Sequence, residues 1–230
     1  MPHVFVADVA APQLDDDDRH HLERVLRVRA GEEVTVADGR GGWCRCEFAS
    51  GGVLVPIADP ETRPRPAPEI TIAFALTKGE KPELAVQKLT EIGVDRIVPF
   101  VAGRSIARWD EERAARNLAR LRRVAREAAM QSRRVYLPEV SDISDFGAVA
   151  ALPGAILADE AGQPPSLDRP VVLVGPEGGW TDAERSVGLP VAALGPHVLR
   201  AETAAIVAGA LLIGLRKGLI QHAGSLPDSQ

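Results

Sequence analysis

Two short glycine-containing segments in the last third of the chain have the residue types of a ligand-binding site. The first, Gly175 to Gly179, directly follows the apolar run Val171–Val174, and the second, Gly195 to Thr203, directly follows Val191–Leu194. In an open α/β sheet, ligands bind at the carboxyl ends of the strands, and glycine lets the backbone approach a ligand closely. We therefore predict that the two segments share one pocket and offer backbone N–H and C=O groups to a flat, polar molecule.

Other common site motifs are missing from the sequence or do not fit. There is no G-x-x-x-x-G-K-[ST] phosphate loop, no G-x-G-x-x-G after the first strand of the α/β part, and no G-x-S-x-G nucleophile elbow. The spacing of His20, His21, Cys44 and Cys46 matches no common zinc pattern, so no metal site is expected. The two cysteines, two residues apart on one strand, are expected to be reduced thiols of a cytoplasmic protein. No apolar run is long enough to span a membrane.

Basic residues are concentrated in one segment. From Arg104 to Arg134 there are ten arginines against four acidic residues, a local charge of +6, so the rest of this chain of net charge −5 carries −11. Arg113, Arg116, Arg120 and Arg123 recur at helical spacing and form a stripe along one side of a predicted helix over 112–130. Charge alone favours a solvated helix face over a polyanion-binding one.

The predicted secondary structure that positions these residues differs between the first and the second part of the chain. Residues 1–66 predict a small β-rich domain with strands over 4–6, 33–37, 43–48 and 53–57 and one helix over 17–28. A segment with four prolines in nine residues, 60–68, predicts a stiff connector and the domain boundary.

Residues 67–230 alternate between strand and helix patterns and predict a mostly parallel α/β sheet. Strands are expected over 70–76, 96–101, 155–158, 171–174 and 191–194, with Pro99 indicating an edge or a bulge. Helices are expected over 82–92, ended by Gly93, then over 112–130, from Thr181 with capping-box spacing, and over 203–217. The tail from His222 is expected to be frayed.

Five stretches in this order resemble one family, the 16S ribosomal RNA uracil N3-methyltransferases of the SPOUT class. They are His21-Leu22-Glu23-Arg24-Val25-Leu26-Arg27, then 78–81 continuing to 87–94, 128–134 ahead of Pro138-Glu139, 173–179, and Leu194-Gly195-Pro196-His197-Val198-Leu199-Arg200-Ala201-Glu202-Thr203-Ala204. The last two together are the most specific, and the five span nearly the whole chain.

The resemblance implies a PUA-like β-barrel RNA-binding domain over 1–66. It also implies a SPOUT α/β methyltransferase domain over 67–230 with a C-terminal trefoil knot, a rare topology that no periodicity predicts. It further implies S-adenosyl-L-methionine as cofactor, a homodimer, and 16S ribosomal RNA or the assembled small subunit as partner, with no metal and no membrane involved.

The resemblance also implies roles for particular residues. The implied cofactor-binding residues are Leu76, Leu173, Gly175, Glu177, Gly178, Leu194, Gly195, Leu199, Arg200, Thr203 and Ala204. Arg200 is the candidate for stabilising the uracil anion or orienting the base, and Glu202 either accepts the proton or holds Arg200. The candidate RNA-binding residues are Arg24, Arg27, Lys78, Lys81, Arg113, Arg116, Arg120, Arg123, Arg133 and Arg134.

The chain departs from the family pattern at three places. Met130, Ser132 and Arg133 stand where the family often has Cys and Gly, His197 replaces an Arg, and Ala201 replaces a Thr. The first two leave the details of RNA contact open. Two other functions also stay open: a knotted methyltransferase acting on transfer RNA, and a non-catalytic RNA-binding ribosome-assembly factor.

Overall fold

The computed structural model describes residues 1–107 and 109–221. Arg108 of the basic segment and the tail from His222 lie outside the described residues. The chain divides into two compact units, Met1–Pro66 with Arg126–Leu137, and Ala67–Ala125 with Pro138–Gln230. The predicted boundary after residue 66 assigns 126–137 to the second domain, whereas the structure groups these residues with the first unit. The reason is burial, because Ala129, Met130 and Val135 belong to the first unit's hydrophobic core.

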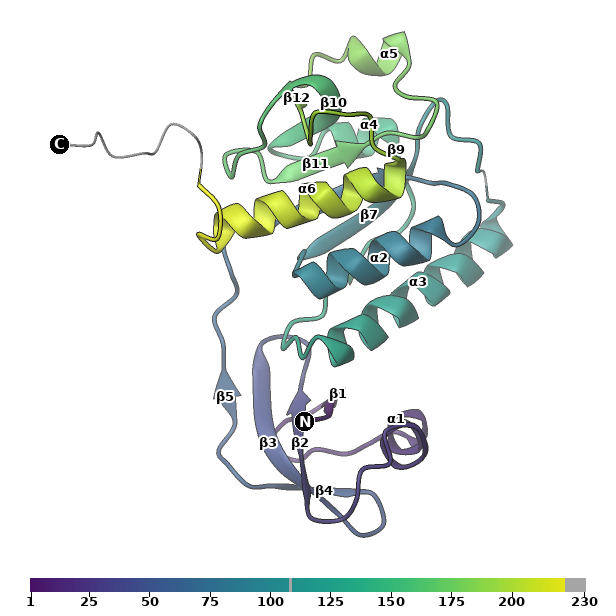
Figure 1. Ribbon diagram of the computed structural model, residues 1–230. Coiled ribbons are helices and arrows are strands. Elements are labelled where there is room, and N and C mark those ends of the chain that lie inside the picture. Colours follow the sequence, from purple (N-terminus) through teal and green to yellow (C-terminus); the bar gives the residue numbers. More distant parts are fainter. Residues whose placement is uncertain (108, 222–230) are drawn as a thin grey trace, which may run out of the picture. The chain divides into compact units, whose positions relative to one another are not determined.

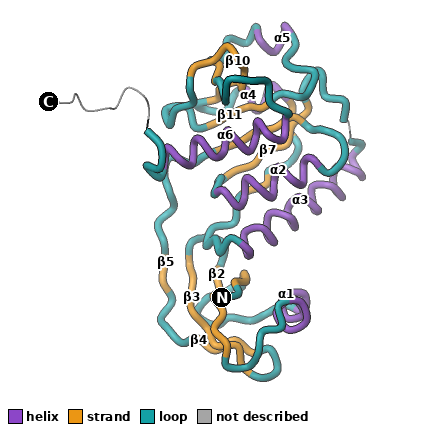
Figure 2. Tube along the Cα trace, in the orientation of Figure 1, coloured by secondary structure: helices purple, strands orange, loops and turns teal. Residues whose placement is uncertain are grey.

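The first unit is built on a five-stranded sheet (Figure 2). Its strands are β1 (His3–Phe5), β2 (Glu32–Ala37), β3 (Gly42–Ala49), β4 (Val53–Pro56) and β5 (Glu61–Thr62). β1 pairs with β2 in parallel, and β3 pairs antiparallel with β2, β4 and β5. Along β3 every second residue is buried, as a half-buried strand requires, and this places both cysteines in the core as free thiols. Burial raises the pKa of Cys46 to about 12, with the neighbouring Cys44 adding to the effect.

The helix predicted over 17–28 is shorter and differently wound than expected. A short α-helix, α1 (Asp16–His20), is capped by the Asp15 carboxylate, which accepts from the Asp18 N–H at 2.7 Å. It continues as one π-helical turn, η1 (His21–Val25). Leu22 is fully buried, but Val25 and Leu26 are 60% and 47% exposed. A regular helix over 17–28 would place these three side chains on one face, whereas the wider winding of the π-helical turn leaves Val25 and Leu26 exposed.

The second unit contains a seven-stranded parallel sheet (Figure 1). Along the main path the order is β12 (Val191–Ala192), β10 (Ala155–Gln163), β11 (Val171–Val174), β6 (Thr71–Ala75), β7 (Arg96–Val101) and β8 (Glu139–Val140), and β9 (Ser144–Asp145) also pairs with β7. The helices are α2 (Lys81–Ile92), α3 (Glu111–Gln131), α4 (Phe146–Ala150), α5 (Asp182–Arg185) and α6 (Ala201–Arg216). The predicted α/β class with a parallel sheet is confirmed.

Alternate residues of the central strands fill two separate cores. Ile72 and Phe74 of β6 belong to a cluster with residues of α2, α3 and α6, and α2 lies beside α6 (Figure 1). Ala73 and Ala75 belong to a second cluster, which includes Trp180 and Val149 of α4. The sheet is thus covered on both faces, which explains why β6 and β11 are buried along their whole length.

Pro99 lies in an interior strand, not at the edge of the sheet. The Ser141 N–H donates to the Ile97 carbonyl of β7, whereas the Leu76 N–H donates to the Phe100 carbonyl from the opposite side. Since successive residues point to alternate sides, Pro99 faces the same neighbour as Ile97. On that side β8 pairs with residues 96–97 and β9 with residues 100–101, so the missing N–H of Pro99 falls in the gap between them.

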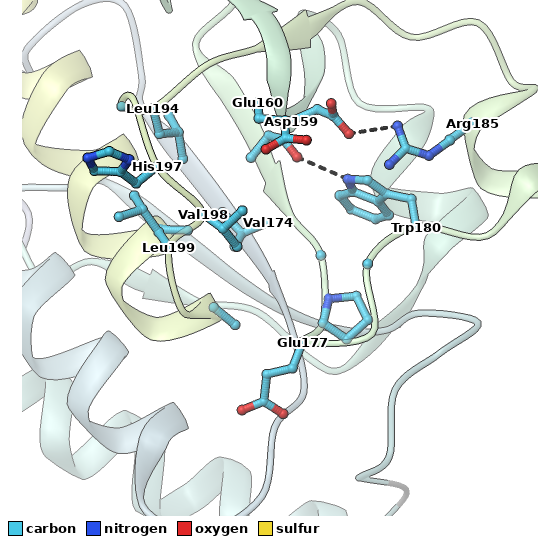
Figure 3. Close-up of a pocket in the computed structure, with 17 residues that line it drawn as sticks. Asp159, Glu160, Val174, Glu177, Trp180, Arg185, Leu194, His197, Val198 and Leu199 are labelled. Carbon is cyan, nitrogen blue, oxygen red and sulfur yellow. Dashed lines mark hydrogen bonds and ion pairs between the residues drawn. The ribbon is translucent and has the colours of Figure 1, made fainter.

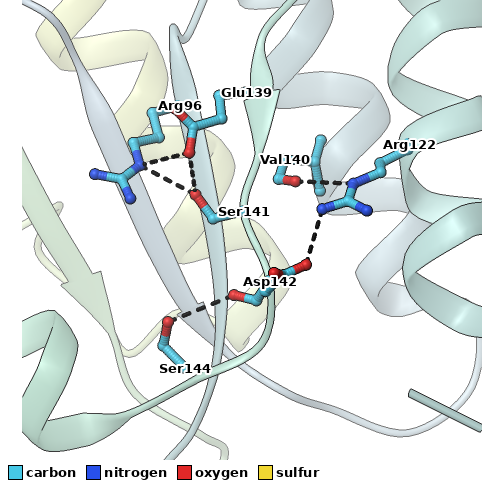
Figure 4. A network of polar contacts seen from close by, with 7 residues as sticks. All are labelled: Arg96, Arg122, Glu139, Val140, Ser141, Asp142 and Ser144. Atoms are coloured by element: carbon cyan, nitrogen blue, oxygen red, sulfur yellow. Dashed lines mark hydrogen bonds and ion pairs between the residues drawn. The ribbon is translucent and has the colours of Figure 1, made fainter. Parts of the chain in front are cut away.

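A set of side chains fixes β8 in the second unit (Figure 4). Arg96 Nε lies 3.0 Å from Ser141 Oγ and 3.2 Å from Glu139 Oε1. From α3, Arg122 donates to the Val140 carbonyl at 3.1 Å and to the Asp142 carboxylate at 2.9 Å. One arginine of the basic segment therefore has a structural role in this unit.

No helix in the described part of the chain is long and apolar enough to cross a membrane.

Candidate functional site

Both glycine-containing turns line a single cavity at the carboxyl ends of β10, β11 and β12 (Figure 3). Its volume is about 250 Å³, near the lower end of the ~300–1,000 Å³ typical of small-molecule sites. From the predicted set, the lining residues are Gly175, Glu177, Leu194, Gly195, Leu199 and Ala204. The other lining residues are Ala158, Asp159, Glu160, Val174, Pro176, Gly179, Trp180, Arg185, His197, Val198 and Ala201.

The first turn is held in place by Trp180. Its indole is 4% exposed, its Nε1–H donates to the Ala158 carbonyl at 3.0 Å, and its ring stacks on Phe100 at 6.3 Å between centroids. A Cβ at Gly175 would lie 3.0 Å from this ring, so the close approach favours glycine there. The turn from β11 is therefore tied to the neighbouring strand β10 by a buried side chain.

The predicted capping box at Thr181 is confirmed, and it does more than start α5. Glu184 accepts from the Thr181 N–H at 2.8 Å, and its other oxygen accepts from the Gly103 N–H at 2.8 Å. Burial of Glu184 opposes its ionisation, but these N–H donors and the Thr181 hydroxyl outweigh burial and hold the pKa of the carboxyl below its usual value. One carboxylate thus joins the loop after β7 to the turn after β11.

The cavity carries an excess of negative charge. Asp159, Glu160 and Glu177 line it, against the single guanidinium of Arg185. Arg185 is itself paired with Asp159 at 2.6 Å, as the dashed line in Figure 3 marks. Val174, Leu194 and Leu199 contribute apolar surface. A ligand that combines a flat apolar ring with a positive charge matches these walls.

Sequence reasoning missed the contribution of β10. Asp159 and Glu160 directly follow the predicted strand over 155–158 and line the cavity. Parallel strands present their carboxyl ends at one edge of a sheet. The residues after this third predicted strand could therefore have been assigned to the same cavity.

The remaining predicted cofactor residues do not line the cavity. Leu76 and Leu173 are buried, at 1% and 0% exposure, and Leu173 belongs to a core cluster. Gly178 accepts at its carbonyl from Arg104 at 3.0 Å. Arg200 and Thr203 are exposed, with Arg200 at the N-cap of α6.

Lys81 connects the first turn to the start of α6. Its ammonium group is hydrogen-bonded to the Glu177 carboxylate and lies 4.0 Å from Glu202 Oε2. These partners raise the pKa of Lys81, with the Glu177 hydrogen bond as the largest cause. The Glu202 side chain is 11% exposed, and its Oε2 is buried with no hydrogen-bond partner among the described residues. The Lys81 ammonium therefore lies close to a buried carboxylate oxygen of Glu202.

The candidate RNA-binding arginines of α3 differ in their partners. Arg113, Arg116, Arg120 and Arg123 are all exposed, as the predicted stripe requires. Arg116 pairs with Glu112, and Arg120 lies 3.2 Å from Glu83, whereas the Arg113 and Arg123 side chains pair with no residue that the structure describes. Arg113 and Arg123 are thus the members of the stripe most available to a phosphate.

In the first unit, the candidates Arg27 and Arg133 both have φ of +54°, and both side chains are exposed. This left-handed conformation is unusual for a residue with a side chain and costs of order 1 kcal/mol or more. Glycine adopts this conformation freely, so arginine at these two positions carries a cost that glycine would not. Of the other candidates, Arg24 and Lys78 are also exposed, and Arg134 accepts at its carbonyl from His3 at 2.9 Å.

Within the described ranges, no group of three His, Cys, Asp or Glu side chains has the arrangement of a metal site.

Comparison with known proteins places the chain in a family. The family model described as an RNA methyltransferase domain matches residues 63–213, and the model of the RNA methyltransferase PUA domain matches residues 14–52. The chain is therefore an RNA methyltransferase with a PUA domain.

Its relatives narrow the family further. The ribosomal RNA small subunit methyltransferase E of Mycobacterium bovis is 34% identical over 226 residues, covering 86% of this chain and 84% of that protein. The Bacillus subtilis protein of the same name is 31% identical over 82% of this chain and 84% of its own length. A crystal structure of the Neisseria gonorrhoeae enzyme of that name, bound to S-adenosyl methionine, has a TM-score of 0.78 at 29% identity and covers 91% of this chain and 95% of that one. This chain belongs to the ribosomal RNA small subunit methyltransferase E family, and the predicted resemblance is confirmed.

Proposed function

We propose that this protein transfers a methyl group from S-adenosyl-L-methionine to N3 of one uracil in 16S ribosomal RNA. The observation that carries the proposal is the single cavity, lined mostly by negative charge, that is formed by the two strand-end turns and residues 158–160 of β10. Family membership supplies the reaction class, and the relatives' names supply the small-subunit RNA.

The residues of this cavity fit the cofactor. S-adenosylmethionine, when bound, supplies an electrophilic methyl group on a sulfonium cation. The carboxylates of Asp159, Glu160 and Glu177 suit that positive charge, and Val174, Leu194 and Leu199 suit the face of the adenine ring. Gly195 has no atom within 4 Å of an added Cβ, so the second turn leaves open space beside its backbone.

The reaction needs two further groups from this chain. Uracil N3 carries a proton and is a poor nucleophile until that proton leaves, and the resulting anion needs a cationic or N–H-rich environment. Arg200 is exposed at the start of α6, and its side chain has no hydrogen-bond or ion-pair partner among the described residues, so its guanidinium is available to the base.

Glu202 is assigned as the proton acceptor. Within the described residues, no hydrogen bond or ion pair joins the side chains of Glu202 and Arg200, which weakens the alternative that Glu202 only holds Arg200. The buried Oε2, which has no hydrogen-bond partner among the described residues, is an available acceptor, and the Lys81 ammonium lies 4.0 Å from it.

The remaining parts of the proposal concern assembly. The family resemblance supports a trefoil knot built from the segments around the two turns, a homodimer, a cytoplasmic location, and a division of labour in which the residues up to 66 hold RNA and residues 67–230 carry the reaction. The exposed arginines of α3, with Arg24, Arg27, Arg133 and Arg134 of the first unit, are assigned to phosphate contacts that position the RNA.

The test is methylation of small-subunit particles from a strain that lacks the enzyme, with labelled cofactor and mapping of the modified base. Label at N3 of one uracil supports the proposal. Label in transfer RNA instead, or no cofactor binding by calorimetry, would establish one of the two alternative functions.

The roles of the two residues are tested by substitution. We expect Arg200→Ala to reduce turnover by at least ~10³-fold while the dissociation constant for the cofactor changes less than threefold, because Arg200 does not line the cavity. Glu202→Gln should remove the acidic limb of the pH profile of kcat, since that limb reports the ionisation of the proton acceptor. Near-normal turnover of Arg200→Ala would refute its assignment.

A further inference from the structure

A second cavity in the same unit is not explained by cofactor binding. It lies between the loop after β6 and the first turns of α3, has a volume of about 490 Å³, and is lined mainly by polar atoms. The loop that separates it from the first cavity is short. Thr77 to Glu80 line the second cavity, and the next residue, Lys81, contacts Glu177 of the first. The two cavities are therefore neighbours across one loop.

The charge of this cavity has the opposite sign to that of the first. Lys78, Arg113 and Arg120 line it against two carboxylates, Glu80 and Glu83. Arg120 is occupied by Glu83 at 3.2 Å. Lys78 and the Arg113 side chain have no partner among the described residues, which leaves two cations available to a single anionic group such as a phosphate.

The remaining lining residues have the chemistry that recognises a nucleobase. Trp109 is half-buried and can stack a base on its indole ring, an interaction worth a large factor in affinity and tolerant of base identity. The Asn117 carboxamide offers a donor and an acceptor side by side, and neither is used within the described residues. Glu83 Oε2 is a buried acceptor without a partner. Unused polar groups lining one cavity indicate a ligand that satisfies them.

We infer that this second cavity binds one nucleotide of the RNA substrate, next to the nucleotide whose base is methylated. Its phosphate is held by Lys78 and Arg113, its base stacks on Trp109, and Asn117 and Glu83 contact the edge of the base. The inference rests on the proposed function, because the neighbouring cavity must hold the cofactor for the adjacent nucleotide to be the target. Extrusion of a base from its stack, which the reaction requires, would be favoured by a second anchored nucleotide beside it.

The test separates this site from general electrostatic attraction. In steady-state methylation of small-subunit particles, Arg113→Ala, Asn117→Ala and Trp109→Ala should each raise KM for the particle at least tenfold, with cofactor affinity changed less than twofold. Trp109→Phe should keep KM within threefold of the wild type, because phenylalanine preserves the stacking surface. Arg169→Ala is the matched control, since Arg169 is an exposed arginine of the same unit that lines neither cavity and is assigned no contact with RNA.

The outcomes distinguish the inference from the proposed function. Equal KM values for Arg113→Ala, Trp109→Ala and Arg169→Ala in an active enzyme would overturn the inference alone. Absence of methylation by the wild type would overturn the proposed function. In that case, RNA binding in the second cavity can still be measured by fluorine NMR on the protein labelled with 5-fluorotryptophan. The fluorine resonance of Trp109 is identified by its absence from the spectrum of Trp109→Phe. In the wild type this resonance should shift when small-subunit RNA is added, and an unchanged resonance at saturating RNA would refute RNA binding in this cavity.

Discussion

The two cavities of the second unit are neighbours but are built in different ways. The first is formed mainly by strand-end turns, and Trp180 and Glu184 fix its wall through buried hydrogen bonds. The second is formed largely by long charged side chains on α3 and on an exposed loop, several of which have no partner in the described structure. The first therefore suits a small ligand of fixed shape, and the second suits a flexible polyanion whose phosphates can meet cations in more than one geometry.

The strongest test of this difference fills the first cavity without disturbing the fold. Gly195 lines it, and a Cβ there would meet no atom within 4 Å. We expect Gly195→Leu to fold normally and to weaken cofactor binding by ~100-fold or more, because its side chain occupies the ligand's space. Calorimetry with S-adenosylmethionine measures the loss, with Gly195→Ala as the smaller control and sedimentation as a check on assembly. Unaltered affinity of Gly195→Leu for S-adenosylmethionine would show that this turn is not part of the cofactor site.

A smaller effect concerns the rigidity of the first cavity's wall. Glu184 is 5% exposed and its pKa is lowered, so in the folded state it holds its proton less tightly than in the unfolded state, where the pKa is about 4.3. Its contribution to stability is therefore fully present above that value and is lost as the pH falls through the lower, folded-state pKa.

We expect Glu184→Gln to cost about 1–3 kcal/mol of unfolding free energy at pH 7, since it removes charge-assisted hydrogen bonds to buried N–H groups. The deficit relative to the wild type should shrink below about pH 4, where the wild-type carboxyl becomes protonated. Urea unfolding of both proteins across this range measures the difference. Thr181→Ser, which retains the cap, should behave like the wild type. A deficit independent of pH would mean that the ionised form of Glu184 is not what holds the loops.

The smallest expected effect is the response to salt, which should distinguish the two cavities directly. Each phosphate contact contributes about −0.7 to −0.9 to the slope of log affinity against log salt concentration. Arg113→Ala should therefore reduce the steepness of that slope for RNA by about one, whereas cofactor affinity should hardly change with salt in either protein. Filter binding at several salt concentrations measures the first and calorimetry the second. An unaltered RNA slope in Arg113→Ala would show that this guanidinium does not meet a phosphate.

Local sequence signals predicted the elements of the second unit well, because hydrophobic pattern and caps act over a few residues. The run 171–174 is β11, residues 96–101 are β7, Gly93 ends α2 in a left-handed conformation, and Thr181 with Glu184 forms the capping box. The predicted strand over 191–194 shortens to Val191–Ala192, because its last two residues already belong to the turn that lines the cavity.

The sequence by itself also determined the family and the two turns that form the first cavity, since strand-end glycines and their order along the chain are local and linear features. Only the tertiary structure decided the rest. It groups residues 126–137 with the first unit. It also places Asp159 and Glu160 in the first cavity, and Trp109, Asn117 and Lys78 around the second. These groupings join residues tens of positions apart, and they depend on strand order and helix packing, which no short-range pattern records.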